Sequence, residues 1–195
     1  VVAFTGHKSL LGPTGIGGLY VREGIEIRHT RAGGTGVRSA IRTHLEEYPY
    51  RMEYGTLNVL GVAGLHAGVK WIEKKGLQTI YEHEMKLTAR LSQGLKEIPG
   101  VILYCQDDLA NHISVLSFNI EGLDAQDTGT LLDVDYSIAC RTGLHCAPLV
   151  HEELGTDKIH GAVRFGIGPF NTEEQIETAI QAVREIASSK AKKRK

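Results

Sequence analysis

Apolar residues recur every three or four positions in two central stretches, the spacing of a helix with one buried face. We predict helices over residues 59–75 and 78–98. Gly76 and the Pro99-Gly100 pair are natural stops for them. The apolar stripes are Val62, Leu65, Val69 and Ile72 in the first helix, and Ile80, Leu87, Leu91, Leu95 and Ile98 in the second.

Three glycines, Gly61, Gly64 and Gly68, lie three to four positions apart in the first predicted helix. A helix face this small lets another element approach closely. Ordinary tight packing in a core gives the same pattern, so the glycines alone do not indicate a function.

A last helix begins near Thr172, because Thr172 and Gln175 have the spacing of a capping box. Its apolar stripe is Ile176, Ala179, Ile180, Val183 and Ile186. We predict another helix over residues 124–133 and irregular structure over residues 33–58. Short apolar or alternating runs predict strands at residues 1–5 (buried), 19–21, 101–104, 113–119, 136–140 and 162–167. This mixture of strands and helices indicates an α/β or α+β protein.

The composition is that of an ordinary globular protein, with 42% hydrophobic and 23% charged residues in a chain of 195. No apolar run approaches the roughly 20 residues of a membrane-spanning helix, and no signal peptide is visible. The three cysteines form no evident disulfide framework, which favours a reducing, cytoplasmic location.

The net charge of −1 hides an uneven distribution. Residues 190–195 carry five positive charges, and subtracting them leaves −6 on residues 1–189. An acidic body argues against nucleic acid as a partner. The basic tail is typical of a frayed, solvated terminus, although it is also able to bind an anionic partner.

Lys8 follows an apolar strand and precedes a glycine-rich loop. The nucleotide P-loop requires glycine directly before its lysine, where this chain has His7. A Schiff-base lysine, held at a strand end and partly desolvated, suits the position. Thr5 and His7 flank it and are able to bind a cofactor phosphate. A solvated surface lysine gives the same sequence pattern.

Cys146 lies in a loop that runs from Cys140 to Pro148 between a predicted strand and an apparent helix. Arg141 and His145 are near in sequence and able to stabilise a nucleophilic thiolate. Three alternatives stay open for this cysteine. They are a buried, inert thiol, a cysteine-protease nucleophile, and a zinc ligand together with His145, His151 and His160.

Arg164 lies inside an apolar strand, where an unpaired charge is costly to bury. Its planar guanidinium suits bidentate recognition of a carboxylate. A structural ion pair with an acidic side chain is the alternative.

Three motifs in this order resemble those of the class V aminotransferases, a fold-type I family dependent on pyridoxal 5'-phosphate (PLP). Residues 4–8 and 11–17 (FTGHK and LGPTGIG) resemble its cofactor-lysine motif. Residues 141–148 (RTGLHCAP) resemble the cysteine loop of its cysteine desulfurases and selenocysteine lyases. Residues 53–58 (EYGTLN) are similar to a segment that reaches the cofactor phosphate of a neighbouring subunit.

The resemblance implies a role for each matched residue. Lys8 would bind PLP covalently and later move protons at the substrate Cα. Cys146 would attack the sulfur of L-cysteine, become a persulfide and release L-alanine. The phosphate would be bound by Thr5, His7, Gly55 and Thr56, the last two across a homodimer interface. Arg164 would bind the substrate carboxylate with help from Arg141, and a sulfur-acceptor protein would be a further partner.

The resemblance also implies a division of the chain. Residues 1–76 would be part of a large PLP-binding domain, residues 77–189 a small C-terminal α/β domain, and residues 190–195 a basic tail. In the family, the aspartate that pairs with the pyridine nitrogen and the histidine that stacks on the ring precede the lysine motif. Nothing precedes Val1, so we expect a C-terminal fragment that is inactive alone.

Two departures bear on the substrate. Leu144 occupies a position where relatives often carry an aromatic residue or histidine, and residues 28–50 match only loosely. Another class V enzyme, such as an aminotransferase, epimerase or selenocysteine lyase, is therefore an alternative. A non-catalytic partner or scaffold is a second alternative, although a scaffold has no use for a Schiff-base lysine.

Overall fold

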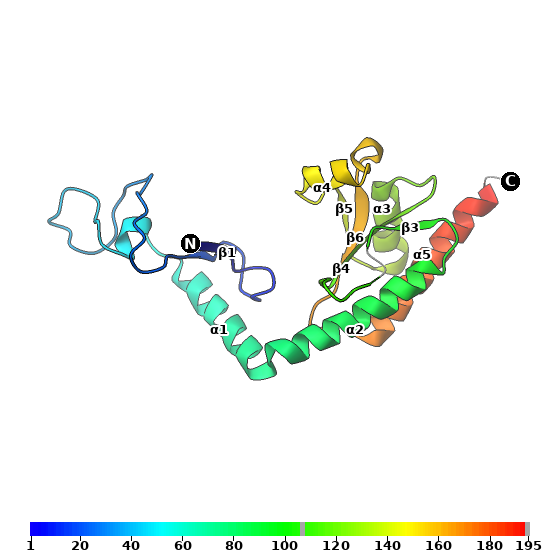
Figure 1. The fold of residues 1–195 in the computed structure, drawn as a ribbon, viewed down its shortest axis with the longest axis horizontal. Coiled ribbons are helices and arrows are strands. Elements are labelled where there is room, and N and C mark those ends of the chain that lie inside the picture. Colours follow the sequence, from blue (N-terminus) through cyan, green and yellow to red (C-terminus); the bar gives the residue numbers. More distant parts are fainter. Residues whose placement is uncertain (106–107, 194–195) are drawn as a thin grey trace. The chain divides into compact units, whose positions relative to one another are not determined.

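A computed structural model describes residues 1–105 and 108–193, with side chains through residue 189 (Figure 1). The side chains of the predicted basic tail, residues 190–195, therefore lie outside the described part. The chain separates into two units, Val1–Leu77 and Gln78–Lys195. The interpretation of these units as a partial large domain and a small domain stays a prediction. Among the described helices, none combines the length and apolar character of a membrane span.

The first unit contains a two-stranded antiparallel ribbon of β1 (Val2–Thr5) and β2 (Gly17–Tyr20). Both predicted strands are confirmed, but the predicted burial of the first is wrong, because Val2 is 57% and Phe4 42% exposed. Among the described residues β1 pairs with β2 alone, and a ribbon of two strands leaves most side chains open to solvent.

Helix α1 (Val59–Lys75) has the predicted bounds. The Asn58 side chain caps its first turn by accepting a hydrogen bond from the Gly61 N–H at 2.9 Å. Gly76, with φ of +90°, ends it. The predicted stripe is buried only in part: Ile72 is 8% exposed, whereas Val62 is 53% exposed. The region before α1 is irregular as predicted, apart from the 3-10 turn η1 (Tyr50–Met52).

The glycine face of α1 admits the loop that carries Lys8. A Cβ added to Gly64 would lie 2.7 Å from Cδ of Pro13, and one added to Gly68 would collide with the backbone of Leu10 and Leu11. The predicted close approach is confirmed for these two glycines. Side chains at these helix positions would displace the loop, so the glycines fix the position of the loop on α1.

The second unit is built on an antiparallel sheet of order β3-β4-β6-β5. The strands are β3 (Val101–Leu103), β4 (Val115–Ile120), β5 (Arg141–Gly143) and β6 (Ala162–Gly166). The helices are α2 (Leu77–Lys96), α3 (Ala125–Tyr136), α4 (Pro148–Glu153) and α5 (Glu173–Lys193), and η2 (Asp157–Ile159) is a 3-10 turn. Strands and helices are mixed along the chain, as the pattern of the sequence predicts.

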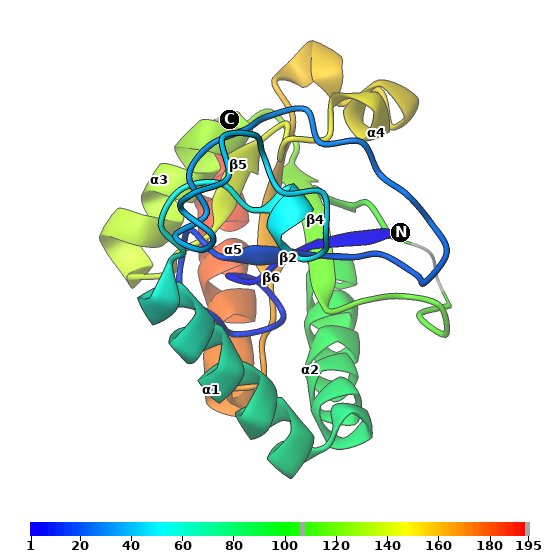
Figure 2. The same cartoon turned by 90° about the vertical axis from the view of Figure 1, so that its left-hand side faces the viewer.

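Helices α2 and α5 run side by side along this sheet (Figures 1 and 2). Lys86 pairs with Glu173 at 2.5 Å, and Arg90 makes two hydrogen bonds of 2.6 Å to Glu177. Their predicted stripes, apart from the half-buried Ile80, form the core together with β4 and β6. Its least exposed large side chains are Leu87, Leu91, Leu95, Leu116, Phe118, Leu132, Val163, Ile180 and Val183, each at most 1% exposed.

The predicted capping box of α5 is confirmed. The Gln175 N–H donates to Oγ1 of Thr172 at 3.3 Å, and the Thr172 N–H donates to Oε1 of Gln175 at 3.2 Å. Two orphan N–H groups of the first turn are thereby satisfied.

The predicted strand over residues 136–140 is wrong, because α3 continues through Tyr136 and the strand begins only at Arg141. Ser137 adopts a left-handed conformation, with φ of +55°, and ends the helix. The Ile138 N–H then returns to the Leu132 carbonyl at 2.9 Å. This helix cap occupies the residues whose apolar pattern resembles a strand.

Candidate active site

Lys8 lies in a tight loop directly after β1. The Gly6 N–H donates to the Ile16 carbonyl and the Gly12 N–H to the Gly6 carbonyl, both at 2.8 Å. The Leu11 N–H donates to the Lys8 carbonyl at 2.9 Å. These bonds hold the loop closed at its neck, so the backbone at Lys8 is fixed by its own unit.

Thr5, His7 and Lys8 present a hydroxyl, an imidazole and an amine from four consecutive positions. All three residues are exposed, and no other described residue hydrogen-bonds to their side chains. A phosphate requires hydrogen-bond donors, which Thr5 and His7 provide, and an aldehyde requires an amine, which Lys8 provides. The residues therefore fit PLP. The partial desolvation expected for Lys8 is not provided by the first unit, because no described element covers it.

Gly55 and Thr56 lie in an exposed turn before α1. Gly55 has φ of +83°, a conformation that favours glycine. Its N–H donates to the Gly34 carbonyl at 2.7 Å, and the Arg31 guanidinium lies 5.8 Å from the centre of the Tyr54 ring. The turn is thus held by residues 31–34, with the Thr56 side chain open to solvent.

Cys146 is exposed, which removes the alternative of a buried, inert thiol. Arg141 lies on β5, not in the predicted loop, and its Nη2 donates to Sγ of Cys146 at 3.2 Å. This hydrogen bond holds the sulfur beside a permanently charged guanidinium. Of the three cysteines, this one has the surroundings of a reactive thiol.

Cys140 lies six residues earlier and contrasts with Cys146. It is half-buried against α3, and burial raises the pKa of its thiol, with a smaller contribution from Asp133. A thiol in this environment stays protonated and unreactive.

His145 does not contact the thiol, although sequence proximity made it a candidate partner. Its Nε2 faces the Arg141 carbonyl at 3.3 Å, and its Nδ1 faces Nε2 of His151 at 3.2 Å. Burial lowers the pKa of His145, and the nearby charge of Arg164 lowers it further, whereas the bond to the Arg141 carbonyl opposes the shift.

The zinc alternative invoked His145, His151 and His160 with Cys146. Within residues 1–105 and 108–193, no three histidine, cysteine or acidic side chains converge as metal ligands. The facing nitrogens of His145 and His151 contact each other, so these two side chains are not arranged to bind one ion together.

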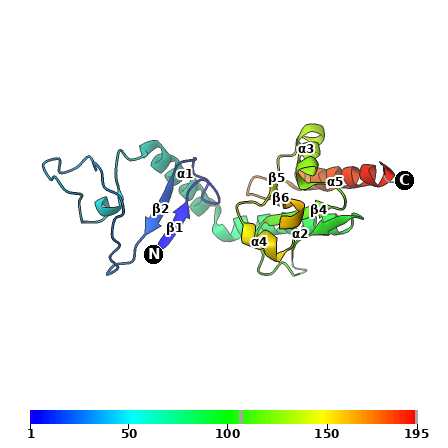
Figure 3. The same ribbon diagram turned by 90° about the horizontal axis from the view of Figure 1, so that it is seen from above.

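Strands β5 and β6 form an antiparallel pair (Figure 3). In the register of this pair, Arg164 lies directly opposite Arg141. Like charges opposite each other destabilise a sheet unless an anion joins them. Arg164 is half-buried, and no described carboxylate lies within 4.0 Å of its guanidinium, so the alternative of a structural ion pair is not seen among the described residues. Two arginines thus occupy paired positions on facing strands, and Arg141 also contacts the thiol.

The family follows from a comparison with known proteins. A family model described as aminotransferase class-V matches residues 1–178. The chain belongs to the class V aminotransferase family.

The most similar class V proteins include several named as desulfurases. A probable cysteine desulfurase of Pyrococcus abyssi is 38% identical over 192 residues, which are 96% of this chain and 47% of that protein. A cysteine desulfurase of Shigella flexneri is 35% identical over 189 residues, 94% of this chain and 44% of that protein. The chain thus spans about half the length of the curated relatives it matches.

Solved structures agree with this grouping. The apo cysteine desulfurase of Thermococcus onnurineus has a TM-score of 0.81 at 38% identity, over 96% of this chain and 46% of that one. The Escherichia coli cysteine desulfurase CsdA, as its S-sulfonic acid, has a TM-score of 0.79 at 34% identity, over 94% and 45%. The predicted fold class, α/β and part of a class V fold, is confirmed.

Two buried residues near the cysteine loop, His151 and Thr156, form a contact that the sequence does not predict. His151 and Thr156 are 3% and 2% exposed, and Nδ1 of His151 lies 2.7 Å from Oγ1 of Thr156. The sequence suggests His151 only as a zinc ligand, and it gives no indication of Thr156, because the fold decides which residue the Thr156 hydroxyl contacts.

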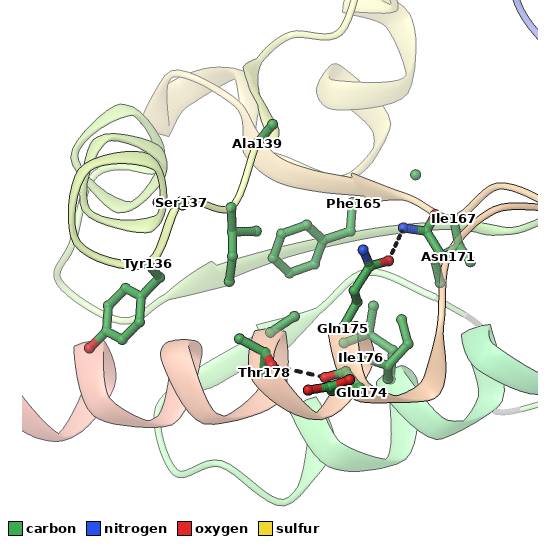
Figure 4. A pocket seen from close by; sticks show the side chains of 14 residues that line it. Tyr136, Ser137, Ala139, Phe165, Ile167, Asn171, Glu174, Gln175, Ile176 and Thr178 are labelled. Atoms are coloured by element: carbon green, nitrogen blue, oxygen red, sulfur yellow. Dashed lines mark hydrogen bonds between the residues drawn. The ribbon is translucent and has the colours of Figure 1, made fainter.

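A separate pocket of about 430 Å³ lies between the turn after α3, β6 and α5 (Figure 4). Tyr136 and Phe165 line it, and Nδ2 of Asn171 donates to Oε1 of Gln175 at its edge at 2.9 Å. None of the predicted site residues lines this pocket, so it is not part of the candidate active site.

Proposed function

We propose that this chain is part of a PLP-dependent cysteine desulfurase, which takes sulfur from L-cysteine as a persulfide on Cys146 and releases L-alanine. The observation that carries the proposal is the exposed thiol of Cys146 with the Arg141 guanidinium 3.2 Å from its sulfur. Membership of the class V family and the names of similar proteins support the same chemistry.

Lys8, Thr5 and His7 would hold the cofactor from one subunit, and Gly55 and Thr56 from its partner in a homodimer. PLP supplies an aldehyde that condenses with amines and a ring that withdraws electrons from the substrate. Thr5 and His7 would donate hydrogen bonds to the phosphate. Lys8 would bind the aldehyde carbon and, once released by substrate, carry a proton at the substrate Cα.

Arg164 and Arg141 would bind the carboxylate of L-cysteine. Two guanidinium groups on facing strands suit a planar anion, and the anion would relieve the repulsion between them. Because Arg141 also contacts Cys146, carboxylate binding and placement of the thiol are coupled through one side chain.

Sulfur transfer is a displacement at the sulfur of L-cysteine. The Cys146 thiolate attacks that sulfur, a sulfur–sulfur bond forms, and the bond from sulfur to Cβ of the substrate breaks. The electron pair of the broken bond goes to the substrate carbon, where a proton completes L-alanine. The persulfide on Cys146 is exposed and accessible to a sulfur-acceptor protein. The three free cysteines support a reducing, cytoplasmic location.

A test compares two cysteine variants of the whole protein. Cys146→Ala should lower the rate of alanine release from L-cysteine by at least about 100-fold, since it removes the nucleophile. Cys140→Ala, a matched change at a half-buried thiol, should retain most activity. Both variants should keep the same PLP content. Full activity of Cys146→Ala on the natural substrate would instead favour an aminotransferase or epimerase.

A further inference from the structure

A chain of polar contacts runs from the interior of the second unit to the backbone beneath the thiol. Oγ1 of Thr156 lies 2.7 Å from Nδ1 of His151, and Nε2 of His151 lies 3.2 Å from Nδ1 of His145. Nε2 of His145 lies 3.3 Å from the Arg141 carbonyl. The first two residues are almost fully buried, so the chain is anchored in the core and ends at the site.

One arrangement of protons satisfies these three contacts with both rings neutral, if the Thr156 hydroxyl uses its proton for His151 Nδ1 at 2.7 Å and not for the His151 carbonyl at 3.4 Å. The Thr156 hydroxyl donates to His151, His151 donates to His145, and His145 donates to the Arg141 carbonyl. This arrangement agrees with the lowered pKa of His145, whose burial and proximity to Arg164 disfavour a charged ring. His145 is therefore held at both nitrogens and has one allowed orientation.

The backbone at this point needs such support. His145 and Cys146 both have left-handed conformations, with φ of +55° and +59°. Each costs a non-glycine residue about 1–2 kcal/mol. The Ala147 N–H closes the turn on the Leu144 carbonyl at 2.8 Å, but that bond alone does not fix the orientation of the thiol.

We propose that His145, held by His151 and Thr156, is a positioning residue that keeps the Cys146 thiol beside the Arg141 guanidinium. His145 holds the Arg141 carbonyl through its ring and Cys146 through the peptide bond, so it sets the distance between them. A role of this thiol position in catalysis rests on the proposed function. The position of the thiol beside the guanidinium does not depend on that function.

The test uses two variants of His151 in the whole protein. In glutamine the amide nitrogen reaches about as far as Nε2 of histidine, so His151→Gln retains a donor toward His145. In asparagine the shorter amide replaces Nδ1 only, so His151→Asn loses that donor. The readout is the rate at which iodoacetamide alkylates Cys146, followed by mapping the labelled peptide. Alkylation of Cys105 and Cys140 in the same samples is the internal control.

We expect His151→Asn to slow alkylation of Cys146 about fivefold, the effect of roughly one hydrogen bond. His151→Gln should stay within about twofold of the wild type, and Cys105 and Cys140 should be unchanged in both variants. Equal rates in all three proteins would overturn the proposal. An equal slowing in both variants, or a parallel change at Cys105 and Cys140, would also overturn it, because it would indicate general loss of structure.

The experiment separates this proposal from the proposed function, since alkylation needs neither cofactor nor turnover. If no protein, including the wild type, releases alanine while the contrast between asparagine and glutamine persists, the positioning role stands and the desulfurase proposal fails. If the wild type releases alanine and the contrast is absent, the positioning role fails alone.

Discussion

At the scale of single residues, Arg141, His145 and Cys146 lie close together in the sequence. Their positions in the sequence do not determine which of these side chains contact one another. The sequence places Cys146 in a loop and leaves a buried thiol open as an alternative, whereas the structure has the thiol exposed. The sequence offers both Arg141 and His145 as partners of the thiol, but in the structure only Arg141 contacts it, while His145 faces the Arg141 carbonyl and His151. The left-handed backbone at His145 and Cys146 sets the directions of both side chains. His145 is held by His151, which lies in α4, so its direction depends on a contact that the local sequence does not specify.

Arg164 is proposed to bind the substrate carboxylate without taking part in sulfur transfer. Arg164→Gln in the whole protein should raise KM for L-cysteine by about 10- to 100-fold, the loss expected for a charge-assisted bidentate contact. The kcat should change less, because the thiol and its Arg141 contact stay. Steady-state kinetics of alanine release measure both constants.

Arg184→Gln is the control for loss of positive charge, since Arg184 lies on the exposed face of α5 and contacts Gln181 at 3.1 Å. It should leave KM unchanged. An unchanged KM in Arg164→Gln would remove this arginine from the substrate site.

At the scale of elements, the sequence predicts helices whose apolar stripe packs into the core. It mispredicts the strand at residues 136–140, where a helix cap carries an apolar pattern. The stripe of α5 is buried as predicted, and so is the α2 stripe from Leu87 on, because these residues share one core with the sheet. Ile80, at the start of the α2 stripe, is only half-buried and lies outside that core. Residues 136–140 carry an apolar pattern too, but the left-handed cap at Ser137 uses them to leave α3. The predicted burial of β1 is wrong, because burial depends on neighbouring elements, which the sequence of one strand does not specify.

Gly94 tests the contact between α2 and α5. A Cβ at this position would meet the Ile180 side chain, with Cγ1 at 2.7 Å and Cγ2 at 3.0 Å. Alanine usually stabilises a helix by about 1 kcal/mol relative to glycine. Here overpacking against a side chain that is 1% exposed should dominate and lower the free energy of unfolding by about 1–3 kcal/mol.

Urea unfolding of Gly94→Ala, Ile180→Val and the double variant measures this contact. The double variant should be more stable than the sum of the single changes predicts, because the smaller residue makes room for the new methyl group. Strict additivity, or a stabilised Gly94→Ala, would show that the two helices do not meet at this point.

At the scale of the whole molecule, the two units carry different parts of one proposed chemistry. The first presents Lys8 on a loop fixed against α1, and the second presents Cys146 beside Arg141, with Arg164 opposite Arg141 on the next strand. Motif order along the sequence was enough to predict the family and the fold class, because each motif is contiguous. The network of His145, His151 and Thr156 was beyond sequence reasoning, since its members are joined only by the folded second unit.

The most direct test of the account is to locate the lysine that binds PLP. The whole protein with PLP bound is treated with borohydride, which traps a lysine–PLP link, and the labelled peptide is mapped. We predict that the label lies on Lys8 and that Lys8→Ala abolishes it, whereas Lys70→Ala, a change at an exposed lysine of α1, does not. Label on another lysine, or no trapped cofactor at all, would contradict the account.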